Sequence, residues 1–228
     1  DMAMIYSEKP CTQAGVFTSN IVKAAPVRWD KAVVSDSPYA QAVVVNSGIA
    51  NACTGNEGYE YCNQSAQCVA ECLDIPKSSV LVASTGVIGK QLPMDRIAKG
   101  IKMLSESLED TIEAGTRAAE AIMTTDTVSK QVAVKFTVGG KEVIMGGMCK
   151  GSGMIHPNMC TMLGFVTTDL AISKELLQKA LSENVVDTFN MVSVDGDTST
   201  NDTLVILANG MAGNEMITEE NEDYEKFK

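Results

Sequence analysis

The sequence predicts a mixed α/β domain. Short apolar runs that fit β-strands alternate along the chain with stretches in which apolar residues recur at helical spacing. Several of the runs end in segments rich in Gly, Ser and Thr, which fits strands that lead through tight turns into helices. With 45% apolar and 21% charged residues among 228, the composition is that of a globular protein of one or two domains. Intrinsic disorder is excluded.

Six segments are predicted as strands because each is a short apolar or alternating run. They are Ala42–Val45, Val80–Ala83, Gln131–Val138, Lys141–Met145, Gly164–Thr168 and Leu204–Ala208. Gly139-Gly140 separates two of these runs by two residues, which predicts a tight β-hairpin. The first residues, Asp1 to Tyr6, look like the interior of a further strand.

Apolar residues at helical spacing predict three helices. The first two carry on one face, respectively, Cys62, Ala66, Val69, Ala70 and Leu73, and Ile97, Ile101, Leu104 and Leu108. Pro93 lies near the first turn of the second helix, where a missing N–H costs nothing. The third helix is predicted to begin after Ser173 as its N-cap and to continue through Leu181. The charged stretch Glu219–Lys228 fits either a helix start or a frayed end.

The charge balance argues against a nucleic-acid partner. The chain has 18 Lys and Arg against 29 Asp and Glu, a net charge of −11, and its basic residues are scattered. No apolar run approaches the roughly 18 residues of a membrane helix, and the first residues lack a signal-peptide pattern. Among the seven cysteines, Cys68 and Cys72 lie one helical turn apart, but no histidine or second cysteine pair accompanies them. We therefore expect packed free thiols, no metal and a reducing, cytoplasmic location.

Two segments that follow predicted strands carry donors suited to negative charge. Residues 46–55 follow Val43-Val44-Val45, and Ser84–Gly89 follows Val80–Ala83. A chain that turns from a strand toward a helix N-terminus presents backbone N–H groups to a phosphate or a developing oxyanion. Neither segment is a P-loop, because no Gly-Lys-Ser/Thr follows. A tight turn with glycine at positive φ also explains each segment taken alone.

The segment from Cys149 to Leu163 is the most informative one. It contains the only histidine, His156, together with Lys150 and a threonine, Thr161, that comes just before an apolar strand. A hydroxyl is a weak nucleophile until a base takes its proton, and cleavage before Thr161 would supply its own α-amino group as that base. Such a group has a pKa near 7.7–8.0, close to working pH. A Ser152/His156 pair is the alternative, but it lies in a Gly/Pro loop without a Gly-x-Ser-x-Gly elbow.

Six motifs along the chain occur together. The longest runs from Lys150 to Met159 as Lys-Gly-Ser-Gly-Met-Ile-His-Pro-Asn-Met and continues with Thr161-Met162-Leu163. The others are residues 44–48, 51–55, 81–89, 121–127 and 194–203. In this order they closely resemble the ornithine acetyltransferase family, the bifunctional glutamate N-acetyltransferases of arginine biosynthesis. The motifs span most of the chain, which is more than a chance match produces.

The resemblance implies a precursor that cuts itself between Cys160 and Thr161. Residues 1–160 are then an α chain, and residues 161–228 are the start of a β chain. The implied fold is a self-processing one with an N-terminal threonine nucleophile, like those of DmpA and ornithine acetyltransferase. Thr161 is the implied nucleophile, which takes the acetyl group of N-acetylornithine and passes it to glutamate. The resemblance assigns Thr85 and Gly86 to the oxyanion hole, and Thr124, Lys150 and Thr161 to substrate binding.

The resemblance also implies partners, and the sequence departs from the family at two points. It implies no bound cofactor, with acetyl-CoA as a further donor in some members, and a heterotetramer of two α and two β chains without a nucleic-acid or membrane partner. The family usually has Ala where this chain has Cys160; cysteine is nearly as small, so we expect the bond to be cut. The family also begins upstream of Asp1 and continues beyond Lys228 with further substrate-binding residues. We therefore expect the site in this chain to be incomplete.

Other interpretations stay open. A self-processed amidohydrolase or aminopeptidase uses the same nucleophile and gives the acyl group to water, whereas an inactive truncated fragment serves as an interaction domain. Asp195, Gly196, Asp197 and Asp202 also suggest a metal loop. Their spacing departs from the EF-hand pattern and no glutamate closes it, so we expect a hydrogen-bonded turn near the active site instead.

Overall fold

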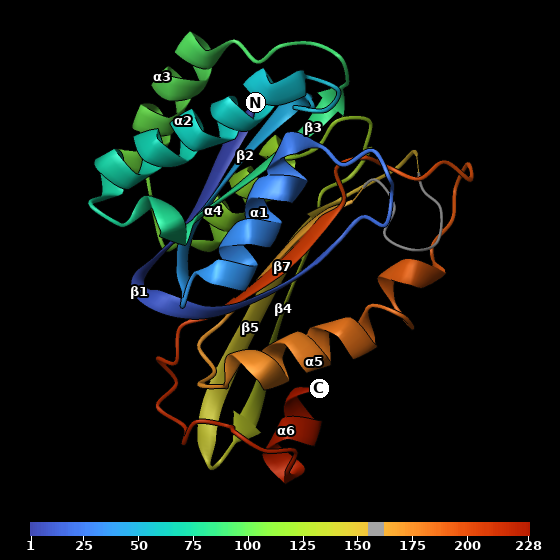
Figure 1. The fold of residues 1–228 in the computed structure, drawn as a ribbon. Coiled ribbons are helices and arrows are strands. Elements are labelled where there is room, and N and C mark those ends of the chain that lie inside the picture. Colours follow the sequence, from blue (N-terminus) through green and yellow to red (C-terminus); the bar gives the residue numbers. More distant parts are fainter. Residues whose placement is uncertain (155–161) are drawn as a thin grey trace.

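The computed structural model describes residues 1–154 and 162–228. A seven-stranded mixed sheet, in the order β3-β2-β1-β7-β6-β5-β4, is flanked by helices (Figure 1). The strands are β1 (Met2–Phe17), β2 (Ala40–Ile49), β3 (Val80–Val87), β4 (Lys130–Val138), β5 (Lys141–Lys150), β6 (Leu163–Thr168) and β7 (Thr203–Ala208). The helices are α1 (Ala25–Asp36), α2 (Gly55–Leu73), α3 (Met94–Ser105), α4 (Ile112–Ala121), α5 (Lys174–Asn184) and α6 (Glu222–Phe227), with 3₁₀ turns at Lys77–Ser79 and Phe189–Met191. The predicted mixed α/β class is confirmed.

Strand β1 joins the two halves of the sheet. Its first residues pair antiparallel with β2, and its last residues pair antiparallel with β7. The register shifts between Tyr6 and Cys11, and Figure 1 shows the strand bending around the domain. The β2–β3 and β6–β7 pairs are parallel, whereas β4–β5 and β5–β6 are antiparallel. One bent strand, β1, therefore joins the β2–β3 half of the sheet to the half formed by β7, β6, β5 and β4.

Two apolar clusters hold the helices to the sheet. The larger one combines β1, β2 and β3 with α1, α2 and α3, and its members include Trp29, Val69 and Ile101. The smaller one seats α5 and α6 on the second half of the sheet, around Leu177 and the fully buried Tyr224. Figure 1 shows α2 and α3 at one end of the domain and α5 and α6 at the other.

Helix α1 covers the free edge of β3. The Trp29 indole N–H donates to the Val80 carbonyl at 3.0 Å, and the Asp30 carboxylate accepts the Val82 N–H at 2.8 Å. Asp30 is fully buried, and burial raises the pKa of its carboxyl well above the usual range even though the Val82 hydrogen bond acts in the opposite direction. An unpaired strand edge is a template for pairing with another chain. Two side chains of α1 therefore form hydrogen bonds with a carbonyl and an N–H of β3 that would otherwise be available to another strand.

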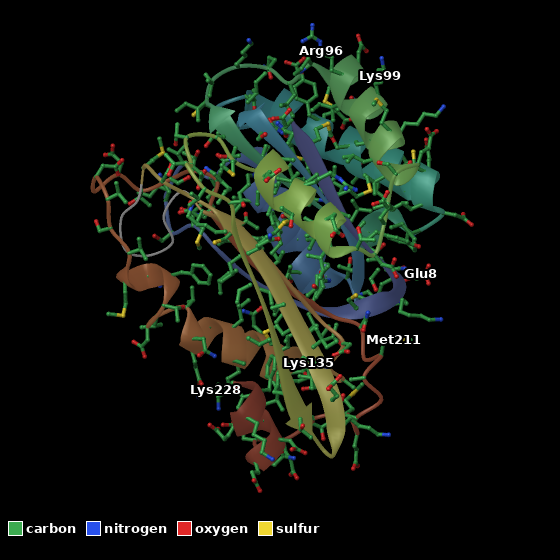
Figure 2. The ribbon with its side chains drawn as sticks, turned by 180° about the vertical axis from the view of Figure 1, so that it is seen from behind. Glu8, Arg96, Lys99, Lys135, Met211 and Lys228 are labelled. Carbon is green, nitrogen blue, oxygen red and sulfur yellow. The ribbon has the colours of Figure 1, made fainter. Side chains whose placement is uncertain are left out.

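Many charged side chains lie on the surface. In the rear view, Arg96, Lys99 and Lys228 point away from the molecule (Figure 2).

Within the described residues, no helix is both long and apolar enough to cross a bilayer, and no group of three or more His, Cys, Asp or Glu side chains is placed to hold a metal ion.

Several local predictions are confirmed. All six predicted strands form, and Gly139 and Gly140 make the hairpin turn with φ of +53° and +74°. Helix α5 begins after Ser173, whose hydroxyl accepts the Leu176 N–H at 3.4 Å. The charged end of the chain forms α6. The helix expected around Ile97 is α3, which ends at Ser105, so Leu108 lies outside it.

Two expectations are wrong, and two helices were missed. Residues 46–49 and 84–87 are not turns, because β2 and β3 continue through them as a parallel pair as far as Ile49 and Val87. Cys72 is exposed and Cys68 is half-buried, so this pair is not packed in the core. Helices α1 and α4 were not among the three predicted, since α1 mixes its apolar residues with charged ones and α4 buries only Ala119.

Candidate active site

The ends of four strands meet around Lys150. Lys150, the last residue of β5, lies in register with Leu163, which begins β6, and Leu163 lies in register with Thr203, which begins β7. The Lys150 Nζ lies 3.3 Å from the Thr85 hydroxyl oxygen near the end of β3. Strand pairing thus gathers residues from distant parts of the chain at one place.

Lys150 is buried, with 2% of its surface exposed. Burial lowers the pKa of its ammonium group, as does the charge of Lys130, while the charges of Asp126 and Asp202 raise it. Among the described residues, Thr85 is the hydrogen-bond partner of Nζ. A poorly hydrated ammonium group with one neutral partner keeps hydrogen-bonding capacity for an anionic or carbonyl oxygen.

Gly86 follows Thr85 and must be glycine for steric reasons. Its φ is +127°, and a Cβ atom there would lie 2.2 Å from the carbonyl carbon of Gly48 on the adjacent strand. Thr85 is buried, whereas Gly86 is exposed. The buried Thr85 hydroxyl and the exposed Gly86 backbone thus adjoin each other at the end of β3.

Asp126 connects the predicted Thr124 to this region. Its carboxylate accepts the Thr124 N–H at 3.4 Å, the Gly151 N–H at 2.7 Å and a hydrogen bond from the Lys130 ammonium group. Burial raises the pKa of Asp126, but these three hydrogen bonds and the charge of Lys150 outweigh it, so the net pKa is lowered. An ionised Asp126 therefore ties the exposed Thr124 loop to the residue that follows Lys150.

Asn201 and Asp202, the two residues before β7, make further contacts at these strand ends. The Asn201 side-chain amide donates to the Ser84 carbonyl at 2.7 Å, and one oxygen of Asp202 accepts the Met162 N–H at 2.9 Å. Both side chains are buried. Burial raises the pKa of Asp202 to about 7, against the lowering effects of the Met162 amide, the neighbouring Ser199 hydroxyl and the charge of Lys150. These contacts tie the residues before β7 to the end of β3 and to the residue before β6.

Asp202 should make stability depend on pH. Because its pKa is higher in the folded state than the ordinary 3.8, folding binds a proton between about pH 4 and pH 7, and stability falls as pH rises through this range. Relative to Asp202→Asn, which does not titrate, the parent should lose at most about 4 kcal/mol of unfolding free energy. Urea unfolding of both proteins at pH 5 and pH 8 measures this difference. Identical pH dependence in the two proteins would show that the pKa of Asp202 is not raised.

The structure therefore places some predicted residues and not others. Thr85 and Lys150 are in contact, Gly86 adjoins them, and Thr124 is linked to them through Asp126. Cys160, Thr161 and His156 lie outside the described residues. Ser152 is described, and its hydroxyl lies 2.6 Å from that of Thr125.

The organising roles of Asp126 and Asn201 were not predicted, and Asp202 was considered only as a metal ligand or as part of a hydrogen-bonded turn. A usable signal was present, because Asn201-Asp202 directly precedes the apolar run of β7. Polar residues at such a strand end often hydrogen-bond the backbone of adjoining segments.

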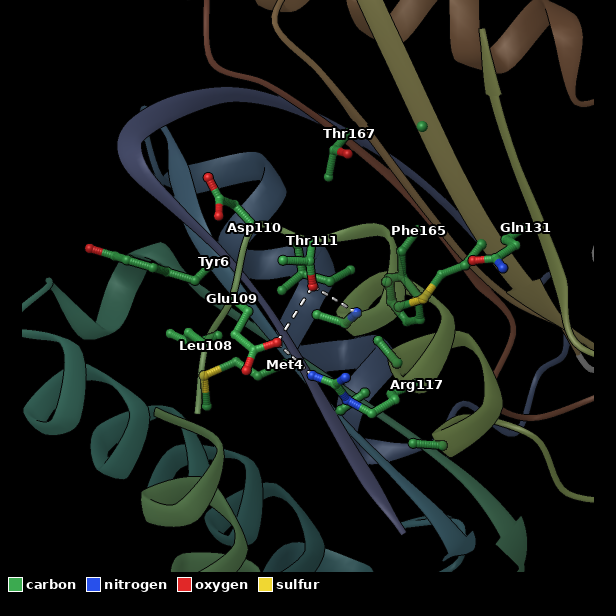
Figure 3. Close-up of a pocket in the computed structure, with 18 of the residues that line it drawn as sticks. Met4, Tyr6, Leu108, Glu109, Asp110, Thr111, Arg117, Gln131, Phe165 and Thr167 are labelled. Atoms are coloured by element: carbon green, nitrogen blue, oxygen red, sulfur yellow. Dashed lines mark hydrogen bonds and ion pairs between the residues drawn. The ribbon is translucent and has the colours of Figure 1, made fainter. Parts of the chain in front are cut away.

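A cavity in the described part of the chain lies elsewhere. It has a volume of about 1230 Å³, and its wall includes Met4 and Tyr6 of β1, Phe165 and Thr167 of β6, and Arg117 of α4 (Figure 3). Arg117 forms an ion pair with Glu109 at 2.8 Å on one side of this cavity. None of Thr85, Gly86, Thr124 and Lys150 lines it. The cluster around Lys150 is thus separate from this cavity.

The mixed α/β fold is similar to that of two solved structures. One is an arginine biosynthesis bifunctional protein ArgJ from Bacillus halodurans, 46% identical, with a TM-score of 0.67 over 72% of this chain and 83% of that one. The other is an ornithine acetyltransferase from Mycobacterium tuberculosis in complex with ornithine, 32% identical, with a TM-score of 0.59 over 72% of this chain and 84% of that one.

The chain belongs to the ArgJ family, whose pattern matches residues 1–228. It is 54% identical over 229 residues to an arginine biosynthesis bifunctional protein ArgJ 1 of Clostridium acetobutylicum, and 52% identical over 228 residues to an ArgJ protein of Thermotoga neapolitana. Both matches cover all of this chain but only 55% and 57% of the relatives. The chain therefore spans about half the length of the curated relatives it matches.

Proposed function

We propose that this chain is the first part of an acetyltransferase that moves an acetyl group from N2-acetylornithine to glutamate in arginine biosynthesis. The observation that supports this most is the contact between the buried Lys150 and Thr85. It joins two family motifs that lie 65 residues apart in the chain. The family membership and the ornithine-bound relative agree with an amino-acid substrate of this kind.

The proposed reaction begins with a cut before Thr161. The Thr161 hydroxyl attacks the Cys160 carbonyl, and the C–N bond between the two residues breaks while the nitrogen takes up the proton. Water then hydrolyses the resulting ester, which leaves a carboxylate on Cys160 and a free α-amino group on Thr161. That amino group is the general base of the subsequent transfer.

In the transfer, the Thr161 hydroxyl attacks the acetyl carbonyl of N2-acetylornithine. The tetrahedral oxyanion is held by the Thr85 hydroxyl and the Gly86 N–H, and ornithine leaves with the proton as the acetyl ester forms. The glutamate amine then attacks this ester, and the hydroxyl of Thr161 is restored. Lys150 and Thr124 contact the substrate, with the Lys150 ammonium group facing a carboxylate or the oxyanion. Each oxyanion donor is typically worth about 3–4 kcal/mol.

Sheet pairing supports an association of the two products of the cut. Strand β5 precedes the cut and β6 follows it, yet the two pair antiparallel from Met145 and Thr168 to Lys150 and Leu163. Strand β7 likewise pairs with β1. We propose on this basis that the α chain, residues 1–160, and the β chain that starts at 161 stay together. The proposal of a heterotetramer of two α and two β chains rests on the family resemblance alone.

We also propose the location, cofactor and partners of the enzyme. The enzyme works in the cytoplasm without a bound cofactor and without a nucleic-acid or membrane partner. The net charge of −11 and the free thiols of the described cysteines support this setting. Acetyl-CoA is a further donor to be tested directly as a replacement for N2-acetylornithine.

Steady-state kinetics test the proposal on the complete reading frame that encodes this chain. Because one pocket serves both amino acids, ornithine leaves before glutamate binds, and double-reciprocal plots at several glutamate concentrations should be parallel. Intersecting lines would contradict an acetyl-enzyme. Acetate release at the same rate without glutamate would identify a hydrolase, and no turnover of N2-acetylornithine would identify an inactive protein.

A further inference from the structure

Charges of both signs lie around the buried Lys150. The described charged groups that act on its ammonium group are Asp126 in the segment before β4, Lys130 at the start of β4, and Asp202 just before β7. The two carboxylates favour the charged form of Lys150, whereas burial and the charge of Lys130 oppose it. Its described hydrogen-bond partner, Thr85, is neutral. The protonation of Lys150 therefore depends on these neighbouring charges.

The two carboxylates differ in how they are hydrogen-bonded. The Asp126 side chain is fully buried and accepts two backbone N–H groups and the Lys130 ammonium group. Burial alone would raise the pKa of Asp126, but these hydrogen bonds and the charge of Lys150 lower it overall. One oxygen of Asp202 has no hydrogen-bond partner among the described residues, and burial raises the pKa of this carboxyl to about 7. Near neutral pH, Asp126 is therefore ionised, whereas Asp202 is ionised only in part.

Asp126 is held in a fixed position beside the end of β5. Its Oδ1 accepts the N–H of Gly151, the residue after Lys150, at 2.7 Å. The hydroxyl oxygens of Thr125 and Ser152 lie 2.6 Å apart and join the same two segments next to this bond. The negative charge of Asp126 is therefore part of the site and is not carried by a mobile surface side chain.

We propose that Asp126 is a positioning residue whose charge keeps Lys150 in its ammonium form, and that Lys130 limits this effect. The inference rests on the proposed function, in which the Lys150 ammonium group faces a carboxylate or the oxyanion of the substrate. The ammonium form donates a charge-assisted hydrogen bond to such an oxygen, whereas the neutral amine forms a weaker one. Lys130 opposes the charge of Lys150 directly and also pairs with Asp126.

NMR of the Lys150 side chain tests the inference in the complete reading frame. In protein that carries ¹³C-labelled lysine, the Cε shift of Lys150 reports its protonation as pH rises, and Lys150→Arg identifies its signal by loss. Asp126→Asn keeps an acceptor for the Gly151 N–H but removes the charge, so Lys150 should lose its proton at lower pH than in the parent. Lys130→Gln removes a positive charge and the partner of Asp126, so Lys150 should lose its proton at higher pH.

Activity should follow the charge on Lys150. At a pH at which Lys150 is charged in the parent but neutral in Asp126→Asn, kcat/KM for N2-acetylornithine should be lower in the variant by about tenfold or more. This is the loss expected when a hydrogen bond to a charged group is removed. At a lower pH, at which Lys150 is charged in both proteins, the two values should agree within about threefold.

Thr125→Val is the matched control, because it breaks the neighbouring contact between the same two segments without removing a charge. It should leave the titration of Lys150 and the pH dependence of kcat/KM as in the parent. A shift like that of Asp126→Asn in this control would assign the effect to the contact between the segments and overturn the role of the charge.

The titrations and the kinetics separate this inference from the proposed function. Unshifted titrations, or shifts in the same direction in Asp126→Asn and Lys130→Gln, would overturn the inference whether or not the enzyme is active. If Asp126→Asn does not fold, the direction of the shift in Lys130→Gln decides. Opposite shifts with unchanged kcat/KM would show that transfer does not use the charge of Lys150, which also overturns the inference. Opposite shifts in a parent protein that does not turn over N2-acetylornithine would support the effect on Lys150 and overturn the proposed function alone.

Discussion

Replacing Thr161 by alanine is expected to leave the chain uncut and to abolish acetyl transfer. The variant has no hydroxyl to attack the Cys160 carbonyl, and no nucleophile to carry the acetyl group. Denaturing mass analysis should show one uncut mass where the parent shows two fragments that separate between residues 160 and 161. Turnover of N2-acetylornithine should fall to the background rate.

Thr161→Ser is the chemical control for this experiment. It keeps a hydroxyl at the same carbon, so cutting and transfer should persist, with altered rates. Fragments that still begin at position 161 in the alanine variant would show that another protease makes the cut. An uncut parent that behaves like the alanine variant would show that Cys160 does not permit cleavage.

Thr85→Val should lower kcat by about a hundredfold or more. Valine has nearly the shape of threonine but lacks the hydroxyl, so the oxyanion loses one donor, and a loss of this kind typically costs a factor of 10² to 10³ in kcat. The change in KM should be smaller, because the interaction is made mainly in the transition state. Initial rates with both substrates, together with the amount of acetyl-enzyme at steady state, measure the effect.

Two variants separate this effect from a loss of packing. Thr85→Ser keeps the hydroxyl and should keep most of kcat. Thr168→Val removes another buried hydroxyl, which donates to the Ile144 carbonyl at 2.8 Å far from the cluster, and should change stability without changing kcat. A kcat within a few-fold of the parent in Thr85→Val, with normal acetyl-enzyme, would move the oxyanion assignment to residues 46–55.

Local signals predicted much of the fold. Uninterrupted apolar runs such as that of β7 have few alternatives to a buried strand, and the pair Gly139-Gly140 fits a two-residue hairpin because both positions need positive φ. The Ser173 cap was predictable for the same reason, since its hydroxyl satisfies an N–H within its own helix. Each of these features depends on residues within a few positions of one another.

The rest depends on pairing between distant segments. Nothing in the pattern of Met2–Phe17 indicates that one strand changes partners from β2 at Cys11 to β7 at Thr12. The Lys150–Thr85 contact requires the order and register of the sheet, which apolar periodicity does not encode. The family resemblance pointed to both residues, but not to the Asp202 contact that lies beside them.

The split pairing of β1 also sets the order of events during synthesis. Thr12 pairs with Ala208 and Phe17 with Thr203, so the last part of β1 is paired only when β7, made nearly 200 residues later, has been translated. At ribosomal speeds of about 5–20 residues per second, that interval is roughly 10–40 s. A nascent chain carries an unpaired β1 throughout this time and is exposed to chaperones and to misassembly. The second half of the sheet, from β7 to β4, can therefore join β1 only after β7 has been translated.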